Sequence, residues 1–344
     1  SSIFIANIPV IALAFIGSMI YASNSHDPNV PSTDIPGVVL SVTGLVALLY
    51  GIIEAGVIGW GNSRIYISLA LAAVLLAAFG YWESKAKNAM LPIFLFKNKS
   101  FTGANIALTM DMFALFGCSF FLSQYFQTVL GHTAFEAGIA MLPLAAVVVI
   151  ASALSAKASE RFGIKVVVSA SLFVLSLGLF YMYLTSGIDT TYPTILVGMI
   201  IIGIGTGTAT GPATDSVMGA VPVSKAGIGS AMNDTTRELG GALGVAVLGT
   251  VMNSVFLGRL DQLTVLKLLP VSVDSSIRSG IEGAHQFATY IPFPHIQEKF
   301  LTYVNEAFVQ GMREALLVAT IVIALTALVS YFVLPAQIQR AEEE

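Results

Sequence analysis

The sequence predicts an all-α protein: a bundle of helices that cross a membrane many times. Of its 344 residues, 56% are hydrophobic and only 10% are charged, whereas about 25% are charged in an ordinary soluble domain. The apolar residues gather in stretches long enough to cross about 30 Å of hydrocarbon. Several stretches are rich in glycine, which weakens helices in water but lets neighbouring helices approach closely in lipid.

The apolar stretches predict transmembrane helices in order along the chain. They cover residues 3–22, 35–58, 64–83, 100–128, 134–155, 166–186, 193–219, 227–256 and 309–335. Lysine and arginine concentrate in every second short loop, and the positive-inside rule places these loops in the cytoplasm. We therefore expect a multi-pass protein of the plasma (inner) membrane, with residue 1 outside and the C-terminus in the cytoplasm.

These spans divide the chain into parts. Residues 1–22 hold one span, 23–99 hold a pair of spans and an amphipathic cytoplasmic linker, and 100–344 hold six spans. Between the last two spans lies an outer loop at 257–308, with pieces that could be helical. A loop of that length is usually functional or disordered.

Composition and motifs exclude several functions. The net charge of −4 is small and scattered, which argues against a nucleic-acid partner. Cys118 is the only cysteine, and the four histidines fall in loops without metal-ligand spacing. No nucleophile elbow, phosphate loop or metalloprotease motif occurs. We expect no metal, no cofactor and no enzyme activity.

Glycines on two neighbouring spans predict faces where helices touch. Gly240, Gly244 and Gly249 lie in the span at 227–256, and Gly203 and Gly205 lie in the preceding span. Small residues four apart allow close backbone contact in lipid. The spacing leaves open whether this contact is static or slides as the helices move.

Ionisable residues inside the predicted spans suggest a site. Asp111 lies about 16 Å along its helix, near the bilayer midplane, where an ionisable residue is by default a functional candidate. A structural aspartate bonded to a neighbouring helix is the alternative. An unpaired buried arginine is costly, so Arg237 should pair with Asp234, three residues earlier, or with Asp215.

Two segments of residues 100–344, GMIIIGIGTGTA and GGALGVAVLG, resemble motifs of the C-terminal six-helix half of major facilitator superfamily transporters. The segment GMIIIGIGTGTA is similar to the motif R-x-x-Q-G-x-G; it keeps Gly203 and Gly205 but carries Met199 and Ile202 at the arginine and glutamine positions. The segment GGALGVAVLG resembles the antiporter signature G-x-x-x-G-P-x-x-x-G, with Val245 where the proline would be.

The loop AKASERFGIK is similar to the family loop signature G-x-x-x-D-R-x-G-R-K. The resemblance implies a cytoplasmic latch made by Glu160, Arg161 and Lys165, which opens when the two halves move. Ordinary positive-inside charge is the alternative. The spans at 35–83 resemble the pair that fourteen-span drug:proton antiporters insert between their halves, and IFIANIP resembles the start of that family's sixth span.

The resemblance implies the last nine spans of a proton-coupled exporter of small amphiphilic or cationic compounds. Its partners would be protons, a small-molecule substrate, the lipid bilayer and a missing N-terminal half. The first span of the six-helix half lines the central cavity in this family. That position implies a substrate or proton-coupling role for residues of this span: Asp111, Asn105, Gln124, Phe116 and Phe120. The alternative is a non-transporting truncated or accessory protein that binds a ligand or partner through the outer loop.

Overall fold

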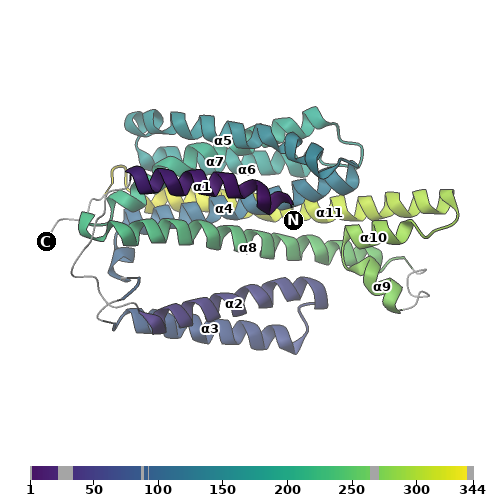
Figure 1. Cartoon of the computed structure of the whole chain (residues 1–344), viewed down its shortest axis with the longest axis horizontal. Coiled ribbons are helices and arrows are strands. Elements are labelled where there is room, and N and C mark those ends of the chain that lie inside the picture. Colours follow the sequence, from purple (N-terminus) through teal and green to yellow (C-terminus); the bar gives the residue numbers. More distant parts are fainter. Residues whose placement is uncertain (1, 22–33, 87–88, 92, 264–270, 339–344) are drawn as a thin grey trace. The chain divides into compact units, whose positions relative to one another are not determined.

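The computed structural model describes residues 2–21, 34–86, 89–91, 93–263 and 271–338, and all regular elements within these ranges are helices (Figure 1). The predicted all-α fold is confirmed. The chain divides into two units, Ser1–Asp34 and Ile35–Glu344. The first contains α1 (Ser2–Tyr21), an apolar helix of 20 residues. The tail at 341–344, predicted to be cytoplasmic, lies outside the described residues.

Eight helices of the second unit are long and apolar enough to cross a membrane, counted over the described ranges. Each corresponds to one of the predicted spans after the first. They are α2 (Ile35–Ile58), α3 (Ser63–Glu83), α4 (Lys99–Gln124), α5 (Ala134–Phe162), α6 (Ile164–Thr185), α7 (Tyr192–Gly219), α8 (Ala226–Leu260) and α11 (Pro294–Val333).

The last six of these helices form one bundle around a shared apolar core. Helix α4 contacts α7, α8 and α11; α7 also packs against α5 and α6, and α6 against α11. The core between them is closed by large side chains with no exposed surface, such as Phe101, Leu108 and Leu172. Helix α4 is therefore the inner element that positions residues on its neighbours.

Local sequence explains where these helices begin and end. The Glu136 backbone N–H donates to the Thr133 hydroxyl at the start of α5, and the Glu136 carboxylate accepts from the Thr133 backbone N–H at 2.8 Å. This capping box satisfies two N–H groups that a helix start leaves free. Gly163, with φ of +79°, joins α5 to α6 in a conformation that favours glycine.

Helices α2 and α3 form a hairpin that lies beside α8 (Figure 1). The Thr250 hydroxyl donates to the Ile52 carbonyl at 2.8 Å, and the Asn253 side-chain amide donates to the Gly56 carbonyl at 2.6 Å. Polar side chains of α8 thus bond directly to the backbone of α2. Part of the predicted linker after α3 lies outside the described residues, but Ile93–Lys97 forms a short 3₁₀ helix, η1.

The connection between α8 and α11 is shorter than the predicted loop at 257–308. Helix α8 continues to Leu260, and α11 begins at Pro294 and runs for 40 residues. The early start of α11 follows from buried apolar residues at helical spacing, Val304, Ala307 and Phe308. Two short helices, α9 (Val271–Arg278) and α10 (Ile281–Ala288), occupy the connection, where helical pieces were predicted.

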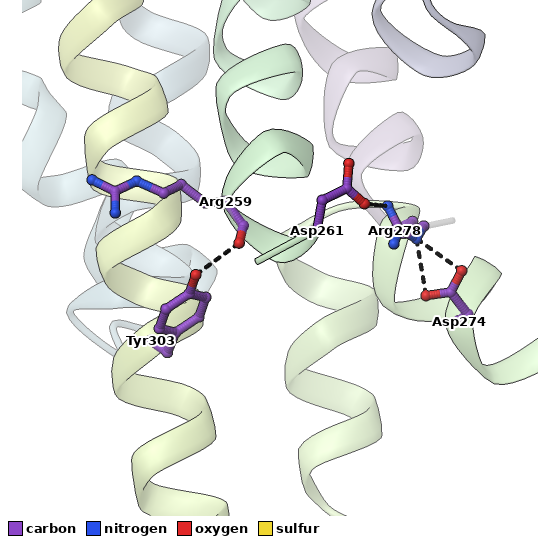
Figure 2. Close-up of polar contacts among 5 residues, drawn as sticks. All are labelled: Arg259, Asp261, Asp274, Arg278 and Tyr303. Atoms are coloured by element: carbon purple, nitrogen blue, oxygen red, sulfur yellow. Dashed lines mark hydrogen bonds and ion pairs between the residues drawn. The ribbon is translucent and has the colours of Figure 1, made fainter. Parts of the chain in front are cut away.

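Figure 2 shows the contacts that tie this connection to the end of α8. Arg278 at the end of α9 forms ion pairs of 2.7 Å with Asp261 and 2.8 Å with Asp274. The Tyr303 hydroxyl of α11 donates to the Arg259 carbonyl at 2.7 Å. These ion pairs are partly exposed, so each contributes about 0.2–1 kcal/mol. Together they fix the corner between α9 and α10 near the end of α8.

Two glycines of α8 lie directly on the backbone of α4. A Cβ at Gly240 would overlap the Thr109 carbonyl, and one at Gly244 would lie 2.8 Å from the carbonyl carbon of Phe113. A hydrogen bond crosses the same contact, from the Thr236 hydroxyl to the Asn105 side-chain oxygen at 2.7 Å. The two helices therefore approach as closely as their backbones allow.

The other predicted contact glycines divide into two groups. Gly203 lies against Val147 of α5, and Gly205 against the backbone of Leu175 in α6. At Gly249, by contrast, a Cβ would meet no atom of a neighbouring helix within 4 Å, so the prediction of a contact there was wrong. A five-residue step turns a helix about 140° away from Gly244, which places Gly249 on a different face of α8.

We predict that Gly244→Ala destabilises the bundle by about 1–3 kcal/mol, because the added methyl group overlaps the α4 backbone and forces the helices apart. Thermal unfolding of the purified protein in detergent measures the loss. Gly249→Ala is the matched control on the same helix, and its melting temperature should stay the same or rise slightly. Equal melting temperatures for Gly244→Ala and the unaltered protein would contradict the close contact.

We also predict that Asn105→Ala costs about 0.6 kcal/mol, and at most about 1.7 kcal/mol, since hydrogen bonds between membrane helices are worth that much. A double-mutant cycle with Thr236→Val checks the reason. If the bond is the source, the double variant should be no less stable than Asn105→Ala alone. Strictly additive losses would show that the two side chains stabilise the protein separately.

Candidate functional site

Helices α4, α5, α7 and α8 surround a cavity of about 550 Å³ that we call the charged cavity. Its three ionisable residues, Asp234, Arg237 and Glu238, all come from α8. The remaining lining residues are apolar or carry hydroxyl groups: Met112, Leu115, Phe116, Val148, Val149, Ser152, Thr206 and Thr210. The cavity thus combines both signs of charge with one aromatic wall.

Asp111 of α4 is fully buried and is not itself a lining residue of this cavity. Its Oδ2 atom accepts a hydrogen bond of 3.1 Å from the hydroxyl of Thr210, which itself lines the cavity. Its Oδ1 atom and the Thr206 hydroxyl have no hydrogen-bond partner among the described residues. One threonine therefore separates a buried carboxylate from the open space.

The ion pair predicted for Arg237 is not formed. Among the described residues, neither Asp234 nor Asp215 lies within pairing distance of Arg237. The prediction assumed that Arg237 is buried. In the structure it is half-buried and lines the charged cavity, while Asp234 and Asp215 are exposed. The penalty for leaving the guanidinium without an ion-pair partner is therefore smaller than for a fully buried arginine.

The structure places the polar and aromatic candidates of α4 in three different environments. Phe116 lines the charged cavity. Asn105 is buried in the contact with α8, where its amide nitrogen donates to the Phe101 carbonyl and its oxygen accepts from Thr236. Phe120 and Gln124 line a second cavity. Asn105 thus takes part in the helix contact and lines neither of these two cavities.

The second cavity has a volume of about 290 Å³, and we call it the uncharged cavity. It lies between α2, α4 and α8, with α10, α11 and the corner before α10 at one end. It shares no lining residue with the charged cavity. Its lining residues are Ile53, Gly56, Val57, Phe120, Gln124, Val245, Ala246, Gly249, Thr250, Met252, Asn253, Phe256, Ser279, Gly280, Ile281 and Phe308.

The predicted latch residues lie at the junction of α5 and α6. Arg161 lies over the Phe162 ring at 5.3 Å, and the Lys165 ammonium lies 4.3 Å from the centre of the Tyr331 ring of α11. Neither cation pairs with Glu160 among the described residues. The contact between this junction and α11 is therefore a cation–π contact, which is worth about 0.5–1 kcal/mol at an exposed site.

Sequence reasoning missed Thr210, whose hydroxyl donates to Asp111, and Thr206, which lines the same cavity one helical turn earlier. Thr206 and Thr210 are four residues apart in the run TGTATGPAT, so they share one face of α7. Two hydroxyl groups at that spacing on a glycine-rich apolar helix could have indicated a polar face. The sequence alone could not show which helix that face would contact.

Comparison with known proteins identifies the family. The family model described as Major Facilitator Superfamily matches residues 1–245. The multidrug resistance protein Stp of Mycobacterium tuberculosis is 30% identical over 346 residues, which cover 99% of this chain and 64% of that protein. The tetracenomycin C resistance and export protein of Streptomyces glaucescens is 27% identical over 352 residues, covering 100% of this chain and 64% of that protein.

A third relative, the multidrug efflux pump LfrA of Mycolicibacterium smegmatis, is 28% identical over 329 residues, covering 95% of this chain and 64% of that protein. The chain therefore spans slightly less than two thirds of the length of each of these relatives. The family model matches well over half of the chain, and the described helices are those of a multi-pass membrane protein. The chain belongs to the Major Facilitator Superfamily.

Proposed function

We propose that this chain forms part of a proton-coupled membrane exporter of small amphiphilic or cationic compounds. The observation that carries the proposal is the buried Asp111 carboxylate, which reaches the charged cavity through the Thr210 hydroxyl. The names of the relatives, which describe multidrug resistance, drug efflux and export, support the same class of function.

The site suits exchange of a cation for a proton. A buried carboxylate is costly when it is charged and alone, so Asp111 is stabilised either by a proton or by a nearby positive charge. Asp234 and Glu238 draw cations into the cavity, and the exposed ring of Phe116 offers a face for a cation–π contact. Protonation of Asp111 would weaken the hold on a bound cation and favour its release.

The architecture of the proposal is that of a fourteen-span exporter. The chain covers 64% of the length of each relative described above, which is about nine fourteenths. Alternating access moves two halves about a central site. The helices around the charged cavity would then form one wall of that site, and a preceding six-helix half would form the other wall.

We predict that Asp111→Asn in the full-length protein abolishes ethidium export by cells while the amount of folded protein stays close to normal. Asparagine keeps the shape of the side chain and a carbonyl that can accept from Thr210, but it cannot bind and release a proton. The measurement is the rate of ethidium efflux from preloaded cells, with membrane protein quantified in the same cells.

Asp215→Asn is the matched control, since Asp215 is exposed on the same helix as Thr210 and does not line the charged cavity. Its efflux rate should equal that of the unaltered protein. Full export by Asp111→Asn would refute the proposed role of the carboxylate. Loss of folded protein in that variant would instead assign Asp111 to the stability of the bundle.

The proposal includes an orientation in the plasma membrane. Positive-inside asymmetry places the α2–α3 turn and α9 outside, and the α3–α4 linker and the α5–α6 junction in the cytoplasm. We predict that an impermeant maleimide labels Trp60→Cys and Ser275→Cys in intact cells and labels Ala86→Cys and Glu160→Cys only after lysis. The native Cys118 is buried and should not react. The reverse pattern would invert the topology.

A further inference from the structure

The uncharged cavity differs from the charged cavity in its chemistry. None of its lining residues is ionisable. Three phenyl rings line it, and those of Phe256 and Phe308 are almost fully buried whereas that of Phe120 is 39% exposed. A molecule that fits this space therefore meets aromatic surface and no formal charge.

Two amide side chains give the cavity a polar component. Asn253 is held in place, because its nitrogen donates to the Gly56 carbonyl. The Gln124 backbone carbonyl accepts from the Thr128 hydroxyl, but the Gln124 side chain forms no hydrogen bond within the described part of the chain. The Gln124 side-chain amide is thus open to a ligand, with one acceptor and two donors.

The cavity is built by elements that other contacts hold in place. Thr250 and Asn253 bond α8 to the backbone of α2, which forms one side. Ser279, Gly280 and Ile281 form one end, directly after Arg278, whose ion pairs tie this corner to the end of α8 (Figure 2). Ligand sites are commonly preformed in this way, with apolar walls and few polar groups.

We propose that the uncharged cavity is a second binding site, for a small uncharged amphiphile that carries an aromatic ring and a hydrogen-bonding group. The lining argues against other occupants: a phospholipid headgroup needs cations for its phosphate, and a cationic compound would lose its hydration here without a carboxylate partner. The site is separate from Asp111 and does not depend on the proposed export function.

The first experiment fills the cavity. Gly249 lines it and has open space around its Cα, so Gly249→Leu should place a side chain inside without disturbing the fold. Gly258→Leu is the control, because Gly258 is on the same helix, also has open space and does not line the cavity. The probe is uncharged N-phenyl-1-naphthylamine, titrated by fluorescence against the full-length protein in detergent.

We expect saturable binding to the unaltered protein and to Gly258→Leu, and at least about a tenfold weaker affinity in Gly249→Leu, as expected when a pocket is occluded. Ethidium, a cationic probe for the charged cavity, should bind all three proteins equally. The absence of saturable naphthylamine binding to the unaltered protein, or equal affinity in Gly249→Leu, would overturn the proposal.

A second measurement decides the matter if Gly249→Leu does not fold. Gly249→Cys and Gly258→Cys are labelled with N-ethylmaleimide, and the buried Cys118 supplies the unreactive background. The naphthylamine should slow labelling of Gly249→Cys several-fold and leave Gly258→Cys unaffected. Equal slowing of both cysteines, or of neither, would show that the probe does not occupy the cavity.

Discussion

Direct contact between the backbones of α4 and α8 determines which side chains of α8 face the two cavities. Gly240 and Gly244 leave no room for a side chain between the helices, and small residues at that spacing are what allow such an approach in a membrane. With one face of α8 held on α4, its remaining faces are fixed as well. One presents Arg237 and Glu238 to the charged cavity, and another presents Gly249 and Asn253 to the uncharged cavity.

Much of this arrangement could be predicted from the sequence, because it depends on local signals. Runs of apolar residues predicted the spans, and the spacing of Gly240 and Gly244 indicated a contact face, although not the helix that it meets. The start of α11 could not be predicted from hydropathy, since residues 294–308 are polar on one side and bury only the other.

The site was harder to predict, because it depends on which helices face one another. Asp111 was identified from its depth in the membrane and from the position of its span in the family, but Thr210, its hydrogen-bond partner, comes from a helix about a hundred positions later. For the same reason, the sequence did not reveal that Asn105 bonds to Thr236 of α8, and the predicted ion pair of Arg237 was wrong. Whether a polar side chain bonds to a neighbour or faces a cavity depends on burial, and a single sequence does not show burial.

The two cavities also lie at different levels along α8. Arg237, which lines the charged cavity, and Asn253, which lines the uncharged cavity, are about 24 Å apart along this helix.

The length of α11 has a mechanical consequence. Forty residues make a helix about 60 Å long, roughly twice the thickness of the hydrocarbon core. Its first turns therefore extend beyond the bilayer and carry the contact between Tyr303 and the end of α8. A tilt of the bundle by about 10° would move a point about 45 Å from the pivot by about 8 Å. Helix α11 would then act as a lever that converts a small rotation within the membrane into a large displacement of α9 and α10.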